Sequence, residues 1–149
     1  LQEGGYLRPD ADRKRMKQAK LPPMRFESTD GYPIYVGRNN RQNDELTFRL
    51  ARKDDIWCHA SKVHGSHVII SCGGTTPPDN TVTQAAQLAA YYAETGGGQN
   101  IPVDVTAVKQ VKKIPNGKPG MVIYHTYRTV IANPYPGIVV DALNAEAKE

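Results

Sequence analysis

The sequence predicts an α+β domain: a mainly antiparallel sheet with one long Ala-rich helix and a shorter helix packed on it. Two observations lead to this fold class. Strand-like runs are joined by hairpin turns rather than by regular crossovers, which favours antiparallel pairing. Between them lies a single Ala-rich stretch with helical spacing, and so many small residues on one face imply close packing against a sheet.

Size and composition indicate one globular domain. The chain has 149 residues, 39% of them hydrophobic and 23% charged, which is enough for a real core. No apolar run approaches the roughly 18 residues that span a bilayer, so we expect no membrane insertion. The two cysteines do not make a disulfide framework and are expected to be reduced thiols of a cytosolic protein. Because the chain begins without Met, we expect a fragment of a longer protein.

The positive charge lies at the N-terminus. Residues 1–25 hold seven Lys/Arg against three Asp/Glu, whereas residues 26–149 hold twelve of each. Two interpretations of residues 1–25 stay open: a solvated basic linker, or an arm that contacts phosphate and makes binding salt-dependent. We expect the folded domain at residues 26–134 and a short tail at residues 135–149.

The first half of the domain reads as a hairpin followed by a helix. Residues 25–28 and 32–36 favour strands, and the Asp-Gly pair between them is a strong hairpin signal. A polar loop then leads into a short helix that ends near Lys53. Its Leu46 and Leu50, spaced i and i+4, are expected to face the core.

The second half contains the remaining strands and the best helix. Residues 56–59 and 67–71 read as two strands, and the Ala-rich helix is expected from Asp79 to Glu94. A strand lies within residues 101–111, and residues 121–130 should return beside it after an Asn-Gly turn.

The reactive side chains cluster around the single Trp. Zinc needs three or four converging ligands, and although His59, His64, His67, Cys58 and Cys72 are candidates, no paired CxxC or HExxH spacing joins them. Cys58 and His59 are neighbours in a strand, so their side chains point to opposite faces and do not pair as nucleophile and base. We therefore expect no metal, no cofactor and no catalytic activity.

RNA binding is the third candidate chemistry. Residues 38–43 are Arg-Asn-Asn-Arg-Gln-Asn, whose planar groups hydrogen-bond bases, ribose and phosphate. Trp57 could stack on a base, a contact worth ~1–3 kcal/mol. The alternative is a helix entry with a rich capping network and a Trp in the core. Residue chemistry leaves the two interpretations open.

Several motifs together resemble the NFACT-R domain. Their order and spacing match that family over roughly residues 26–134, which is more specific than any single motif. The matching segments are Ser28-Thr29-Asp30-Gly31, Val36-Gly37-Arg38-Asn39-Asn40-Arg41-Gln42-Asn43-Asp44, Asp54-Asp55-Ile56-Trp57-Cys58-His59, Gly65-Ser66-His67-Val68, Ala85-Ala86-Gln87-Leu88-Ala89-Ala90-Tyr91-Tyr92, and Val103-Asp104-Val105-Thr106 with Lys118-Pro119-Gly120-Met121-Val122.

The resemblance implies a cytoplasmic, ribosome-associated role. The domain would be the C-terminal part of a larger protein, following an N-terminal domain and a coiled coil. Proteins of this family bind the large ribosomal subunit with an obstructed nascent chain, recruit alanyl-tRNA and direct C-terminal alanine tailing. Some are also described as surface adhesins that bind fibronectin, which is the alternative function and would place the protein at the cell surface without a signal peptide.

The expected contact surface combines the 38–43 loop, the Trp/His strand and a lysine-rich hairpin. His64 stands where the family pattern has Pro, and Cys58 replaces an aliphatic residue. The residues predicted to bind RNA are Arg38, Asn39, Asn40, Arg41, Asp55, Trp57, His59, Ser66, His67, Lys109, Lys112, Lys113 and Lys118.

Overall fold

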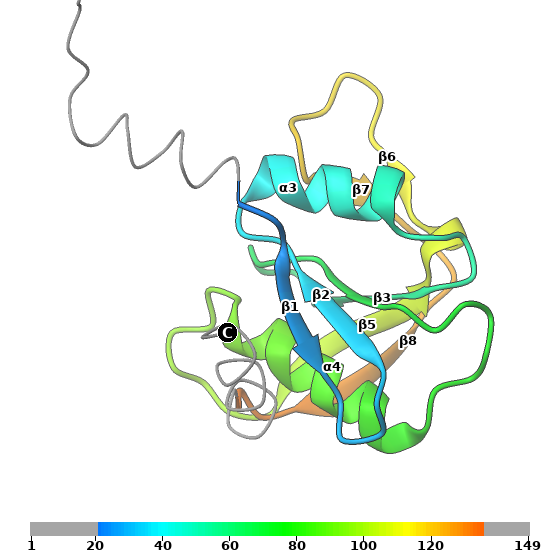
Figure 1. The fold of residues 1–149 in the computed structure, drawn as a ribbon. Coiled ribbons are helices and arrows are strands. Elements are labelled where there is room, and N and C mark those ends of the chain that lie inside the picture. Colours follow the sequence, from blue (N-terminus) through cyan, green and yellow to red (C-terminus); the bar gives the residue numbers. More distant parts are fainter. Residues whose placement is uncertain (1–20, 136–149) are drawn as a thin grey trace, which may run out of the picture.

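A six-stranded antiparallel sheet forms the centre of the domain (Figure 1). The structure is a computed structural model and describes residues 21–135; most of the expected basic linker and the C-terminal tail lie outside this range. The strands follow the spatial order β1-β2-β4-β3-β5-β8. Their bounds are β1 Met24–Glu27, β2 Pro33–Val36, β3 Ile56–Ala60, β4 Val68–Ile70, β5 Ile101–Ala107 and β8 Arg128–Ala132.

Alternation along the strands separates two faces of the sheet. In β3, Cys58 belongs to the core under helix α4 (Asp79–Tyr91), whereas Trp57 belongs to a second core on the opposite face. Trp57 pairs with Ile69 of β4, and Cys58 pairs with Val68, so both strands divide in the same way. The predicted division of β3 is therefore confirmed.

Helix α4 covers the first face with its small side chains (Figure 1). Ala85, Ala86 and Ala89 are fully buried, and Leu88 and Val82 pack beside them. The expectation of a long Ala-rich helix reaching Glu94 is wrong, since α4 has 13 residues and ends at Tyr91.

Helix α4 ends early because the backbone after Tyr91 forms hydrogen bonds with another loop. The Glu94 N–H donates to the carbonyl of His64 at 2.8 Å, and the Ser66 N–H donates to the carbonyl of Tyr92 at 3.2 Å. Gly65 and Ala93 form a bridge between the two segments. The residues after Tyr91 thus pair with the loop between β3 and β4 instead of continuing the helix.

The other face lies under α3 (Asn40–Glu45), the π-helical turn η1 (Leu46–Leu50) and a small hairpin (Figure 1). Leu46 of η1 packs on Trp57 and Ile69 together with residues from the 3₁₀ turn η2 (Val108–Gln110). Leu50, which was expected to face the core, is 58% exposed. The shorter helix therefore packs on the sheet opposite α4, and helices cover both faces.

The hairpin is a separate two-stranded sheet of β6 (Lys112–Lys113) and β7 (Val122–Ile123). The connection over residues 114–121 includes Asn116 at φ 61°, but Gly117 is not in the positive-φ region, so the Asn-Gly pair marks this hairpin without forming a two-residue type I′ turn. The single return strand expected over residues 121–130 is instead divided into β7 and β8. Among the described helices none is long and apolar enough to cross a membrane.

Candidate nucleic-acid interface

The polar loop before α3 divides into structural and exposed residues. Asn39 is the N-cap of α3, since its side-chain oxygen accepts the Gln42 N–H at 2.9 Å. The Gln42 amide accepts the Arg38 N–H at 2.7 Å and donates to the Leu21 carbonyl at 2.8 Å. Buried Asn43 accepts the His67 N–H at 3.1 Å. The capping interpretation of the loop therefore holds for these three amides.

The remaining side chains of the loop face outward. Asn40 and Arg41 are exposed, and Arg38 is half-buried because its Nε donates to the Pro22 carbonyl at 2.7 Å. These three side chains remain able to contact a ligand. Gln42 and Asn43 are thus held within the protein, whereas Asn39 uses only its oxygen for the cap.

Lysines gather in a hollow of about 470 Å³ between η1 and the hairpin. Its basic residues are Lys53, Lys109, Lys112 and Lys113, and Phe48, 37% exposed, supplies an apolar wall. Among residues 21–135, no Asp or Glu lines it. Lys113 pairs with Asp44 at 2.6 Å, whereas the ammonium groups of Lys53, Lys109 and Lys112 have no described carboxylate partner, which makes this hollow suited to phosphate.

A neighbouring hollow of about 640 Å³ continues this surface along α3. It shares Phe48 and Lys113 with the lysine hollow and adds Asn39, Arg41 and Arg49. We call the two hollows together the basic groove. Its lining also includes Asp44 and Glu45 of α3, and Lys113 Nζ lies 2.6 Å from Asp44 Oδ2.

The structure places Trp57 in the core, so the predicted stacking of Trp57 on an RNA base is wrong. The indole is 0% exposed and lies among Leu46, Ile69 and the ring of Tyr124, whose centroid is 4.8 Å away. The segments that bury the indole, η1 and the residues after β7, are distant from Trp57 in the sequence. Trp57 stabilises the domain instead of contacting a ligand.

His67 and Asp55 are also buried and bonded within the protein. The ring of His67 bonds Thr47 Oγ1 at Nδ1 (2.8 Å) and the Gly120 carbonyl at Nε2 (3.1 Å). Burial, with His59 nearby, lowers the pKa of His67 to about 3, so the ring is neutral and Nε2–H donates. Asp55 accepts backbone N–H groups of Arg52, Cys72 and Gly73 at 2.9 to 3.1 Å. Neither side chain presents a surface to RNA.

His59 and Ser66 lie closer to solvent. The His59 ring stacks on Trp57 with centroids 5.6 Å apart and planes 7° apart, and it lines a hollow of about 350 Å³ beneath the hairpin. Burial lowers the pKa of His59. Ser66 Oγ donates to the Gly37 carbonyl at 2.7 Å, which joins its loop to the loop before α3.

The lysine predictions divide similarly. Lys109, Lys112 and Lys113 line the basic groove, as expected of a contact surface, whereas Lys118 on the hairpin turn lines neither of its hollows. Arg49 and Lys53 were missed by sequence reasoning. Arg49 belongs to η1 and Lys53 to the turn after it, so helical spacing does not bring them together, and only the packing of this segment against the hairpin places them on the groove.

The groups considered for metal or nucleophilic chemistry lie apart. Cys58 and Cys72 belong to the core under α4, whereas His59 and His67 lie on the opposite face of the sheet. Burial raises the pKa of the Cys58 thiol to about 12. Within residues 21–135 no three His, Cys, Asp or Glu side chains gather as metal ligands would.

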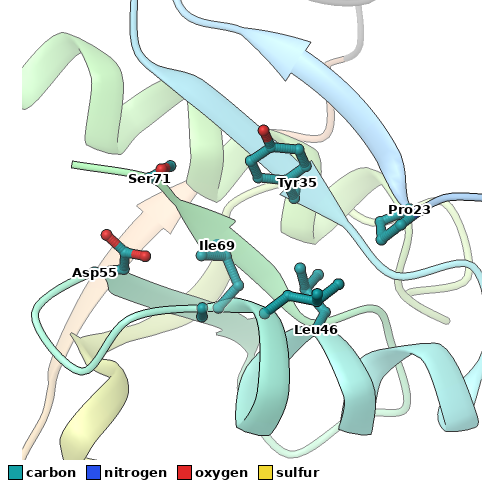
Figure 2. A pocket seen from close by; sticks show the side chains of 8 residues that line it. Pro23, Tyr35, Leu46, Asp55, Ile69 and Ser71 are labelled. Carbon is teal, nitrogen blue, oxygen red and sulfur yellow. The ribbon is translucent and has the colours of Figure 1, made fainter. Parts of the chain in front are cut away.

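A smaller apolar pocket of about 270 Å³ lies on the other side of η1 (Figure 2). Tyr35, Leu46 and Ile69 form its walls, and Asp55 and Ser71 stand at one end (Figure 2). None of the described residues that line it is basic, and the Asp55 carboxylate already accepts backbone N–H groups. This pocket does not suit phosphate, so the basic groove is the candidate interface.

A sheet domain with a lysine groove beside exposed Asn and Arg side chains has the form of a nucleic-acid-binding module. The chain belongs to the family of the NFACT protein RNA binding domain, whose sequence profile matches residues 23–126. The family resemblance inferred from the motifs is thereby confirmed.

Curated relatives are similar over nearly the whole chain. The Rqc2 homolog RqcH of Bacillus subtilis is 43% identical over 143 residues, covering 94% of this chain and 25% of the relative. The Rqc2 homolog RqcH of Streptococcus pneumoniae is 42% identical over 135 residues, covering 90% of this chain and 24% of the relative. The chain therefore spans about a quarter of the length of these proteins.

A solved structure shares the fold. It is the C-terminal part of the fibronectin/fibrinogen-binding protein from Streptococcus suis, with a TM-score of 0.76 and 38% sequence identity. The match covers 85% of this chain and 49% of that one.

Proposed function

We propose that this domain is the RNA-binding, non-enzymatic part of a ribosome quality-control factor. In this proposal the partner is tRNA or the RNA of the large ribosomal subunit, and the parent protein recruits alanyl-tRNA for alanine tailing of stalled nascent chains. The place of action is the cytoplasm. Family membership and the name of the curated relatives support the general role.

The observation that carries the proposal is the lysine hollow. Its lysines come from η2, from β6 and from the turn between η1 and β3, so the fold gathers them. Phosphate contacts supply most of the affinity of nucleic-acid binding without reading sequence. Exposed Phe48 adds an apolar surface on which a sugar or base can rest.

The α3 end of the groove supplies a different chemistry. Arg41 offers a planar guanidinium that binds phosphate with two hydrogen bonds, and the Asn39 amide keeps an N–H₂ donor beside it. Such groups bond ribose hydroxyls and base edges of unpaired RNA. We infer that the lysines hold the backbone while the α3 end contacts sugars and bases.

The test is RNA affinity of the purified domain over a salt series. Lys109→Gln combined with Lys112→Gln is expected to weaken binding to tRNA and to lower the salt slope by about 1 to 2, since each phosphate contact contributes ~0.7–0.9. Lys113 is left intact because it pairs with Asp44.

Arg128→Gln is the control, because exposed Arg128 stands opposite Val105 on the α4 face. It removes a positive charge from the far face and should leave the slope unchanged. Equal losses in the control and the double variant would mean that net charge, not the groove, determines binding. Binding at low salt that is unchanged by the double variant would contradict the proposal.

Fibronectin binding is the second candidate, suggested by the name of the solved relative. It predicts saturable binding of the domain to immobilised fibronectin that survives nuclease treatment. Loss of the signal after nuclease would assign it to bridging nucleic acid and favour the RNA proposal.

A further inference from the structure

A second polar hollow lies at the junction of three loops, next to the basic groove. It measures about 350 Å³, a size in the range of small-ligand sites. We call it the Tyr92 hollow. The side chains on which its chemistry depends are Arg38, Asn39, Asn40, Ser66, Tyr92 and Glu94.

Backbone contacts fix the walls of the Tyr92 hollow. Gly37 N–H donates to the His67 carbonyl at 3.1 Å, and the loop of His64 pairs with Tyr92 and Glu94 by two further bonds of 2.8 and 3.2 Å. At Gly65 an added Cβ would lie 2.8 Å from the Cβ of Ala93. The three loops are therefore in close contact, so the hollow is preformed and does not need a ligand to assemble it.

One wall is aromatic. Tyr92 is half-buried, with its ring 6.3 Å from Phe26 on the core side and 4.9 Å from Tyr91, which is 47% exposed. These neighbours hold the Tyr92 ring in place. A fixed aromatic ring in a solvent-accessible hollow is a platform on which a base can stack.

The other walls supply donors and one acceptor. The Arg38 guanidinium is oriented by its Nε bond to Pro22, which leaves its two terminal amino groups without a described partner. The Asn39 amide uses only its oxygen for capping, and no described partner holds the Asn40 amide. Glu94 adds a carboxylate acceptor.

This combination fits one nucleotide better than a run of phosphates. A carboxylate repels phosphate but accepts hydrogen bonds from ribose hydroxyls, and the 2′-OH is the group that distinguishes RNA from DNA. A guanidinium beside it can take the single phosphate. Asn39 lines both the Tyr92 hollow and the basic groove, so a strand in the groove passes the mouth of the hollow.

We propose that the Tyr92 hollow binds a single unpaired ribonucleotide, with its base against Tyr92, its phosphate at Arg38 and its ribose hydroxyls at Glu94 and the Asn amides. The proposal rests on RNA binding as the function of the domain. The basic groove binds any phosphate backbone, and the Tyr92 hollow would add a second site that selects unpaired RNA over DNA.

The experiment compares an eight-nucleotide single-stranded RNA with DNA of the same sequence by fluorescence anisotropy. Tyr92→Leu is expected to weaken RNA binding about 5- to 100-fold, the loss of one stacked base, while Tyr92→Phe keeps the affinity within about twofold. Tyr127→Leu is the control, because Tyr127 is 49% exposed and lines no part of the hollow. Glu94→Gln is expected to reduce the preference for RNA over DNA.

The outcomes separate this site from the basic groove. A folded Tyr92→Leu protein with unchanged RNA affinity would overturn the proposal that the Tyr92 hollow binds a ribonucleotide, even if the Lys109/Lys112 variant still lost binding. If Tyr92→Leu lowers the melting temperature, Asn40→Leu decides instead, since Asn40 is exposed on the rim. Asn40→Leu should then lower RNA affinity without lowering DNA affinity, and an equal effect on both would contradict the proposal.

Discussion

At the scale of single residues, His67 joins three parts of the domain. Its backbone belongs to the approach to β4, its Nδ1 accepts from Thr47 of η1, and its Nε2–H donates to Gly120 of the hairpin. The Gly120 carbonyl can only accept, so Nε2 carries the proton, and because burial keeps the ring neutral, Nδ1 accepts from the Thr47 hydroxyl. The motif histidine that suggested RNA contact is thus a structural link between elements.

The depressed pKa of His67 predicts acid sensitivity. The unfolded chain takes up a proton near the ordinary pKa of about 6.5, whereas the folded ring resists protonation down to about 3. Stability should therefore fall as pH drops through this window, by about 2 kcal/mol between about pH 7 and pH 5 from His67 alone. His67→Asn should be less stable at neutral pH than the original protein. Between about pH 7 and pH 5, however, its free energy of unfolding should fall by about 2 kcal/mol less, as measured by urea unfolding.

The original protein, unfolded in the same buffers, is the reference for this measurement. His59, whose pKa burial also lowers, is present in both proteins, so His67→Asn should reduce the acid sensitivity without abolishing it. An unchanged pH dependence of stability in His67→Asn would contradict the inference that the lowered pKa of His67 makes the domain acid-sensitive.

Gly37 is required by a close approach rather than by its backbone angle. An added Cβ would overlap the side-chain oxygen of Asn43, the same oxygen that accepts the buried His67 N–H. Gly37→Ala should displace Asn43, leave that N–H without a partner and cost about 1–3 kcal/mol of unfolding free energy. Gly98→Ala, with its nearest contact at 3.3 Å, should cost clearly less in the same denaturation experiment.

At the scale of elements, the β6–β7 hairpin is held to α3 mainly through Asp44. One carboxylate oxygen lies 2.6 Å from Lys113 Nζ, and the other accepts the Gly120 N–H at 3.2 Å. The hairpin has few buried side chains of its own, with both residues of β6 exposed. Its position, and with it the lysine wall of the groove, depends on these contacts.

Asp44→Ala should therefore loosen the hairpin without unfolding the domain. Amides of residues 112–123 are expected to exchange with deuterium about 5- to 10-fold faster, the equivalent of losing roughly 1 kcal/mol of local stability. Amides of α4 should be unaffected. Glu45→Ala, which removes the neighbouring exposed acid, should leave hairpin exchange unchanged; faster exchange there as well would point to a general charge effect.

Elements were predictable where a local pattern determines them. The alternation in β3 predicted its two faces. The Asp-Gly pair predicted the turn between β1 and β2, with Gly31 at φ 87°, and the Asn-Gly pair marked the connection between β6 and β7. The end of α4 was not predictable, because pairing of Ala93 with Gly65 decides it and lies outside any local signal. The burial of Trp57 likewise depends on Leu46 and Tyr124, which only the tertiary fold brings together.

At the scale of the whole molecule, the sheet separates stability from binding. The α4 face is closed by Ala and Val side chains, and the basic groove is built on the elements over the opposite face, whereas the Tyr92 hollow lies between loops at the C-terminal end of α4. The candidate site could be predicted in composition, since the Arg38 loop and the lysines were recognised from sequence. Its geometry could not, because Phe48, Arg49 and Lys53 join it only through packing.

This separation makes stability and RNA affinity independently variable. Ala86 is fully buried between α4 and the sheet, and Ala86→Leu should cost about 1–3 kcal/mol by overpacking. Below its unfolding transition this variant should bind tRNA as tightly as the original protein, because the basic groove lies on the other face. The Lys109→Gln/Lys112→Gln variant should show the reverse, with weaker binding and a melting temperature within a few degrees of the original, since both lysines are exposed at η2 and β6. Thermal unfolding and anisotropy on the same samples measure both quantities. Loss of tRNA affinity in folded Ala86→Leu would show that the two faces are coupled through the sheet.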